Sequence, residues 1–189
     1  MGDFVTRAIT DTEFKNIINT IRSGYVDHEG VTHMPNHQVA DILVLEANLG
    51  CRLGDIITLR HDSFVLDGTI WKLDITEEKT GKKRQFIVPQ PIKEFIDKMN
   101  YGKDGKLFGI AKPAVWKQVR NVTRYLGLKD VSSHSFRKYC ANALYEKTGH
   151  DIETVCELLQ HSSIKITRRY IRRSDAQLEK AISSIISIA

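Results

Sequence analysis

The sequence has few cysteines, no long apolar run and no leader-like start, and each absence argues against a class of protein. Its three cysteines, Cys51, Cys140 and Cys156, are odd in number and lack CxxC spacing. We therefore expect free thiols in a reducing compartment rather than a disulfide framework. No apolar stretch approaches the roughly 20 residues that cross a bilayer. The start, MGDFVTRAIT, has no apolar signal segment, so we expect a cytoplasmic protein.

The length and composition suit a single globular domain. The chain has 189 residues, of which 41% are hydrophobic and 27% are charged. A chain of this size can bury a core without disulfides or metals. It contains no internal repeat and no low-complexity tract. We expect one domain over residues 1–189, with at most a small appendage.

Positive charge is modest in total but concentrated in clusters. The formal net charge is +5. The clustered basic residues are Lys82, Lys83 and Arg84 in one group, and Arg168, Arg169, Arg172 and Arg173 around Tyr170. Such clusters suit a polyanion such as DNA and are candidate DNA contacts. From charge alone, a solvated basic surface is an equally good interpretation.

Hydrophobic periodicity predicts an α+β fold that is mainly helical, with a small antiparallel sheet in the first half. The segments TIWKLDI and RQFIVP alternate and are joined through Thr80 and Gly81, which predicts a β-hairpin. The segment SGYVDHEGVTHMPN is expected to be a polar loop. Helices are expected from Thr10 or Asp11, over 37–49 up to Gly50, around Asp55, from Pro91, from Pro113, over 134–148, over 151–159, over 163–172 and from Ser174.

The segment SSHSFRKYC carries a candidate phosphate site. His134 and Arg137 stand at i and i+3 in the first turn of a helix that Ser133 is expected to cap, so they share a face. The helix start should add free amide donors and partial positive charge. An H-x-x-R string is common by chance, and the alternative is a solvent-facing pair.

Three further segments hold groups whose roles stay open on spacing alone. Arg52 follows the helix-ending Gly50 and needs an anion, either a bound phosphate or Asp55 three residues later. Lys79 stands at the mouth of the hairpin turn, where lysines are commonly just solvated. Tyr170 follows His161 by nine residues, and a tyrosine among arginines is usually a surface residue.

Taken in chain order, these residues resemble the catalytic set of the tyrosine recombinase, or phage integrase, family. The six matching positions are Arg52, Lys79, His134, Arg137, His161 and Tyr170, with Asp55 as a supporting acid. The motifs are LG-C-R with its acidic residue, the hairpin K-T-G, the H-x-x-R box and LQHSSI with its tyrosine, and the resemblance covers about residues 10–189. Departures from the family pattern are Asp55 for glutamate, Gln160 for glycine, and Phe136 and Lys138 for leucine and histidine.

The resemblance implies the family's catalytic-domain fold, without its N-terminal core-binding domain. It implies cleavage and rejoining of double-stranded DNA at a specific site through a 3′-phosphotyrosine at Tyr170, with no metal, cofactor or ATP. Arg52, Arg137 and His161 would bind phosphate oxygens, His134 would be the base and Lys79 the acid. The full-length protein would assemble on DNA as a tetramer. The helix from Ser174 would pack on a neighbouring subunit or on its own core.

Three alternatives remain at this point. A DNA-binding relative could have lost catalysis, although it would have no need of Tyr170. A type IB topoisomerase shares the chemistry but relaxes supercoils, and the LQHSSI segment favours a recombinase. A zinc site at His28, His33 and His37 lacks cysteine or paired carboxylates nearby, so loop histidines are the better interpretation.

Overall fold

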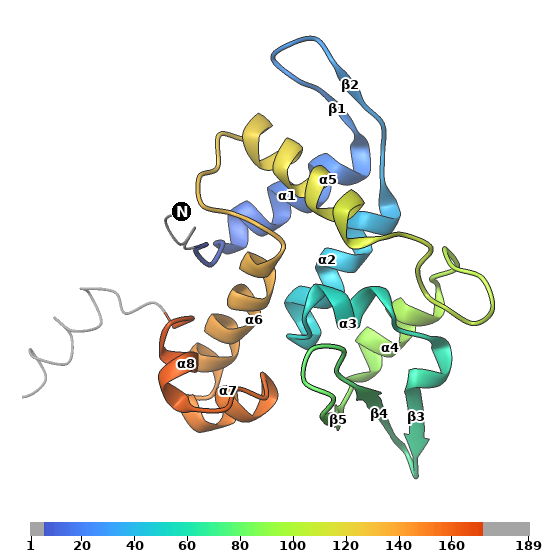
Figure 1. Cartoon of the computed structure of the whole chain (residues 1–189), viewed down its shortest axis with the longest axis vertical. Helices are drawn as coiled ribbons and strands as arrows, with labels where there is room; N and C mark the ends of the chain where they lie inside the picture. The colour runs from blue at the N-terminus through green and yellow to red at the C-terminus, as the bar shows by residue number, and fades with distance from the viewer. Residues whose placement is uncertain (1–5, 172–189) are drawn as a thin grey trace, which may run out of the picture.

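The computed structural model describes residues 6–171 as a mainly helical domain, as expected, with two small antiparallel sheets where one was expected (Figure 1). The helices are α1 (Asp11–Ser23), α2 (His37–Leu49), α3 (Leu53–Ile57), the 3-10 turn η1 (His61–Ser63), α4 (Gln90–Asp97), α5 (Lys112–Tyr125), α6 (His134–Lys147), α7 (Ile152–Leu158) and α8 (Ile164–Arg168). The strands are β1 (Tyr25–Val26), β2 (Thr32–His33), β3 (Phe64–Asp67), β4 (Ile70–Thr76) and β5 (Lys83–Ile87). Arg172, Arg173 and the helix expected from Ser174 lie outside the described residues. Within residues 6–171, every helix is too short or too polar to span a membrane.

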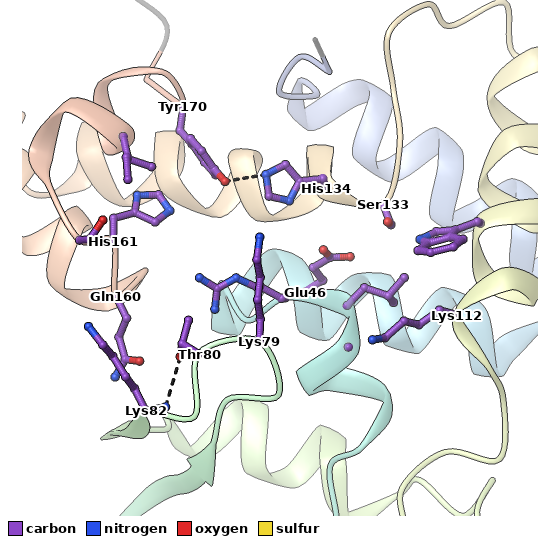
Figure 2. A pocket seen from close by; sticks show the side chains of 16 residues that line it. Glu46, Lys79, Thr80, Lys82, Lys112, Ser133, His134, Gln160, His161 and Tyr170 are labelled. Atoms are coloured by element: carbon purple, nitrogen blue, oxygen red, sulfur yellow. Dashed lines mark hydrogen bonds between the residues drawn. The ribbon is translucent and has the colours of Figure 1, made fainter. Parts of the chain in front are cut away.

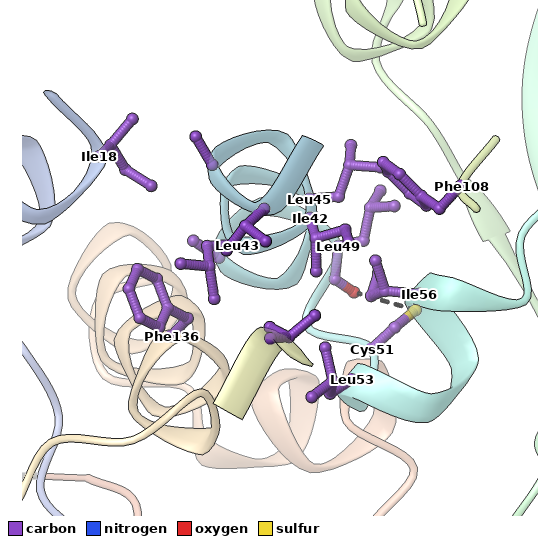
Figure 3. Close-up of a cluster of buried hydrophobic side chains, with 14 of the residues drawn as sticks. Ile18, Ile42, Leu43, Leu45, Leu49, Cys51, Leu53, Ile56, Phe108 and Phe136 are labelled. Atoms are coloured by element: carbon purple, nitrogen blue, oxygen red, sulfur yellow. Dashed lines mark hydrogen bonds between the residues drawn. The ribbon is translucent and has the colours of Figure 1, made fainter. Parts of the chain in front are cut away.

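Helix α2 is the centre of the core and packs against α1 and α6. Its buried residues include Ile42, Leu43 and Leu45, which meet Phe136 of α6 and Phe108 (Figure 3). Gly50 ends the helix with a left-handed φ of 58°, which is the conformation that a glycine adopts without strain. This glycine stop, predicted from the sequence, exposes the last carbonyls of α2 to side chains from other elements.

The three-stranded sheet has the order β3–β4–β5 and holds the predicted hairpin. Strands β4 and β5 pair in the register Leu73 opposite Phe86 and Thr76 opposite Lys83, so residues 77–82 form the tip. Leu73 is fully buried, which anchors the base of this hairpin in the core. The edge strand β3 was not expected, because only its first residue, Phe64, is buried and the burial pattern does not alternate.

The segment expected to be a plain polar loop contains a second hairpin, β1–β2, which projects from the body of the domain (Figure 1). Its base is held by aromatic stacking, with the Tyr25 ring 4.4 Å from His33 and 4.5 Å from Tyr125 of α5. His33 also pairs with Asp27 at 2.8 Å. Stacking between rings distant in sequence leaves no periodic signal, so the polar composition gave the wrong expectation here.

Candidate active site

A cavity of about 580 Å³ opens between the β4–β5 tip and helices α6 to α8 (Figure 2). Five of the six residues singled out from the sequence line it, namely Arg52, Lys79, His134, His161 and Tyr170. The sixth, Arg137, is fully buried within α6. The fold therefore gathers groups that are as far as 118 positions apart into one pocket, counted from Arg52 to Tyr170.

Tyr170 is held in this pocket by contacts on both its ring and its backbone. Its hydroxyl lies 2.6 Å from His134 Nε2, and its ring packs edge-on against His161 at 4.7 Å. Its carbonyl accepts a hydrogen bond from Asn142 of α6 at 2.7 Å. Burial raises the pKa of Tyr170, while the nearby charge of Arg137 opposes that rise. The phenol is thus oriented but stays protonated until a base removes its proton.

Both histidines of the pocket are neutral near neutral pH. Burial first, and then the charge of Arg137, lower the pKa of His134 and of His161 to about 4. A neutral His134 with its hydrogen on Nδ1 can accept the Tyr170 proton at Nε2. His161 Nδ1 lies 2.9 Å from Thr167 Oγ1, a contact that orients this ring beside the tyrosine.

The start of α6 differs from the expected cap. Ser133 has a helical backbone and makes no side-chain cap hydrogen bond. The amides of Ser135 and Phe136 donate to the carbonyls of Ser132 and Ser133, so they are not free donors as the sequence suggested. A turn that precedes the helix uses these amides. These two amides therefore add nothing to the anion-binding capacity of the pocket.

Arg52 pairs with a residue that the sequence did not single out. Its Nη1 lies 2.5 Å from Glu77 Oε2, at the root of the hairpin tip. The alternative pairing with Asp55 is wrong, because Asp55 Oδ1 instead accepts the amide of Glu78 at 2.9 Å. Asp55 is buried and fixes the same hairpin root from the α3 side. Arg52 keeps a 25% exposed side chain, which leaves its guanidinium available to the cavity.

Arg137 and Arg84 clamp the helix ends that meet behind the pocket. Arg137 donates to the Gly50 carbonyl and, at 2.6 Å, to the Leu159 carbonyl. Arg84 donates to Leu49 at 3.0 Å and to Leu158 at 2.7 Å. Carbonyls at helix C-termini lack intrahelical partners, and these two guanidiniums supply them. The ends of α2 and α7 are thereby joined to each other.

The expectation that Arg84 contacts DNA is corrected by this placement. Arg84 is 1% exposed, and its guanidinium also faces the buried Glu77 carboxylate at 3.4 Å. A signal was present in the sequence, because Arg84 stands two residues before Phe86 in β5 and so shares its inward face. Although burial opposes it, hydrogen bonds from Thr80 and Arg52 lower the pKa of Glu77, which keeps this buried carboxylate charged.

We expect Glu77→Ala to destabilise the domain by about 3–5 kcal/mol, because it leaves Arg84 buried without its counter-charge. The matched control is Glu78→Ala, whose exposed ion pair with Lys112 should contribute about 1 kcal/mol or less. Urea unfolding of the two variants is the measurement. Equal midpoints for both would mean that the buried pair adds nothing to stability.

The remaining basic candidates lie at the surface. Lys79 and Lys82 are exposed on the hairpin tip and line the cavity, and in Figure 2 Lys79 points toward His134 and Tyr170. Lys83, Arg168 and Arg169 are also exposed. Lys138, noted as a departure from the family pattern, is buried and donates to the Thr6 carbonyl, with its Nζ 5.3 Å from the centre of the Tyr170 ring.

The three cysteines are free thiols, as expected, with Cys51 and Cys140 buried and Cys156 partly exposed. Cys51 and Cys140 line the junction where α2 ends, since a Cβ on Gly50 would meet the Cys140 sulfur at 3.1 Å. Burial raises the pKa of Cys51 to about 12 and that of Cys140 to about 11, so neither acts as a nucleophile. In the described part of the chain, Tyr170 is the pocket's candidate nucleophile.

Comparison with known proteins agrees with this geometry. The sequence matches the phage integrase family over residues 7–177. It is 28% identical over 169 residues to the probable integrase/recombinase YoeC of Bacillus subtilis, covering 82% of this chain and 90% of that protein. It is 23% identical over 194 residues to the tyrosine recombinase XerA of Pyrococcus furiosus, covering 93% of this chain and 60% of that protein.

Solved structures share the fold. The catalytic domain of bacteriophage HP1 integrase aligns with a TM-score of 0.65 and 19% identity, over 94% of each chain. The XerH site-specific recombinase bound to a palindromic difH substrate, in its post-cleavage complex, aligns with a TM-score of 0.70 and 21% identity. That alignment covers 97% of this chain and 54% of XerH. The chain thus spans about half of XerH and nearly all of the HP1 catalytic domain.

Proposed function

The chain belongs to the phage integrase family as a tyrosine recombinase catalytic domain, and from that premise we propose that it cleaves and rejoins double-stranded DNA through a 3′-phosphotyrosine at Tyr170. The observation that carries the proposal is the 2.6 Å contact between the Tyr170 hydroxyl and His134 Nε2, inside a pocket lined by Arg52 and Lys79. A nucleophile and its base within hydrogen-bond reach, beside fixed cations, is the arrangement that phosphoryl transfer needs.

The attack on the phosphate uses groups already in contact. Neutral His134 accepts the phenol proton at Nε2 while Tyr170 Oη forms its bond to phosphorus. The bond from phosphorus to the 5′-oxygen breaks, and Lys79 supplies the proton that this oxygen takes up. Arg52 offers a forked donor to the non-bridging oxygens, and His161 adds a further donor there.

Arg137 contributes in a different way from Arg52. Each of its terminal nitrogens donates one of its two hydrogens to a carbonyl, and its side chain does not line the cavity. Its charge nevertheless acts on the Tyr170 phenol and favours the phenolate. Rejoining reverses the same steps. Since one phosphodiester linkage replaces another of similar energy, the cycle needs no ATP.

We further propose that residues 1–189 form one catalytic domain that acts on a specific recombination site. The relatives include recombinases solved on DNA, such as XerH on its difH substrate, which supports a DNA partner. Assembly into a tetramer, with the segment from Ser174 packing on a neighbouring subunit, belongs to the same proposal. The exposed Lys82, Lys83, Arg168 and Arg169 would face the DNA backbone.

The test of this function is covalent trapping. A duplex that loses a short strand on cleavage cannot be rejoined, so the protein should remain attached to the 3′ end on a denaturing gel. Strand exchange between two copies of a site then separates a recombinase from a type IB topoisomerase, which would only relax supercoils. A chain that binds DNA without forming any adduct would be a catalytically silent relative.

We expect Lys79→Ala to be slow on normal DNA and close to wild type on DNA whose 5′-bridging oxygen is replaced by sulfur, because a thiolate leaves without a proton. The matched controls are Lys82→Ala, on the same hairpin tip, and Lys83→Ala, at the start of β5, and neither should show selective rescue. Single-turnover cleavage rates on the two substrates are the measurement. If Lys79→Ala is equally slow on both, Lys79 is not the general acid.

A further inference from the structure

A carboxyl group lies in the pocket without a partner. Glu46, on the central helix α2, is 1% exposed and lines the same cavity as Lys79, His134 and Tyr170. Its Oε2 atom is buried and has no hydrogen-bond partner among the described residues. Figure 2 shows the carboxyl group pointing from α2 into the cavity beside Lys79. A buried polar atom left unpaired costs free energy, so its retention calls for an explanation.

The mechanism described above does not use this group. A carboxylate in a cavity that takes a phosphodiester would repel the substrate. A protonated carboxylic acid would instead add an O–H donor, and a phosphate oxygen would supply the acceptor that the described residues do not. Burial raises the pKa of Glu46 well above its usual range, and the charge of Arg137 opposes that rise without cancelling it.

We propose that Glu46 is a protonated carboxylic acid when the pocket holds a phosphate, donates a hydrogen bond to that anion, and weakens anion binding when it ionises. The anion affinity of the pocket would then depend on pH through Glu46 on α2 as well as through the cationic side chains. The inference rests on the proposed function only in requiring that the pocket bind an anion.

Other titratable and charged groups also face this position, and they must be separated from Glu46. They are Arg52 before α3, Lys79 and Lys82 on the hairpin tip, Lys112 on α5, His134 and Arg137 on α6, His161 after α7 and Tyr170 after α8. The two histidines have pKa values of about 4 and stay neutral in the free pocket at higher pH. They are present in every Glu46 variant, so any slope that they cause is common to all.

The direction of the effect follows from the sign of the charge. A carboxyl group is neutral below its pKa and anionic above it, so a raised pKa keeps Glu46 neutral over a wider range. As pH rises through that pKa, a negative charge appears in the cavity and anion affinity falls. A neighbouring like charge can cost tenfold or more in affinity at an effective dielectric constant of about 20.

Sulfate is a suitable probe, because it remains a dianion throughout the range to be examined. Its dissociation constant would be measured from about pH 5.5 to about pH 9 by the ring-proton NMR signals of His134 and His161. At the upper end of this pH range, we expect sulfate to bind the wild-type chain at least about tenfold more weakly than it binds the Glu46→Gln variant. At the lower end of the range, the two affinities should be equal. Glutamine keeps the shape and a donor but cannot ionise.

Two further variants make the result decisive. Glu46→Met also lacks the ionisable group, so it must lose the same pH dependence even if the glutamine variant folds poorly. Glu78→Gln removes an exposed carboxylate near the cavity and should change affinity without changing its slope against pH. If wild type and Glu46→Gln show the same slope, the inference about Glu46 is overturned. If no variant binds sulfate at all, it is the proposed phosphate pocket that fails.

Discussion

Replacing Tyr170 with phenylalanine is expected to abolish the covalent DNA adduct while leaving DNA affinity nearly unchanged. The substitution removes only the hydroxyl that lies 2.6 Å from His134 Nε2. The ring packs onto a small apolar cluster of Ala141, Val155 and Leu159 and should keep this position. Since Tyr170 carries the pocket hydroxyl that contacts His134 Nε2, the loss should reach the detection limit of the assay.

The matched control is Tyr145→Phe, which alters a tyrosine that packs against the same cluster but lies outside the cavity, with its ring tilted against His150 at 4.9 Å. Both variants should fold, and Tyr145→Phe alone should form the adduct on a suicide duplex. A covalent band that persists in Tyr170→Phe would remove Tyr170 from its role. Loss of the band in both variants would show that the effect is not specific to the Tyr170 hydroxyl.

The local elements were predictable because their signals are local. The helix start at Thr10, the glycine stop at Gly50 and the strand pattern of β4 each depend on a few neighbouring residues. Each of these was confirmed in the structure. The order of the motifs also indicated which side chains would meet. Hydrophobic periodicity alone does not predict that Arg52 and Tyr170 share a cavity.

What the sequence could not supply is the buried charge network behind the pocket. Glu77 begins the polar tip that follows β4. The sequence of this tip resembles that of a solvated turn. Only the fold brings it between Arg52 and Arg84, and only the fold brings Arg84 onto the carbonyls that end α2 and α7. The same holds for Glu46, which on sequence alone is one polar residue in an apolar helix.

The two active-site arginines should respond differently to substitution, although the family pattern gives them one role. Arg52→Ala should slow single-turnover cleavage by at least about 100-fold, because a forked donor to the transition state is lost. Its stability should change little, since its side chain is 25% exposed and Glu77 keeps Arg84 and Thr80 as partners. Arg52→Lys retains the charge without the forked donor, so its cleavage rate should lie between those of the wild type and Arg52→Ala.

Arg137→Ala should slow cleavage by a similar factor but should also lower the unfolding midpoint, because the carbonyls of Gly50 and Leu159 lose their buried donor. Arg137→Lys separates these effects, since lysine restores the charge that favours the Tyr170 phenolate but lacks the planar fork that spans the two carbonyls. Cleavage at saturating protein, paired with urea unfolding of each variant, is the measurement. If Arg137→Lys recovers rate without recovering stability, Arg137 acts on the reaction through its charge. If both arginine variants lose only DNA affinity, with cleavage intact at saturation, these residues hold the backbone and do not stabilise the transition state.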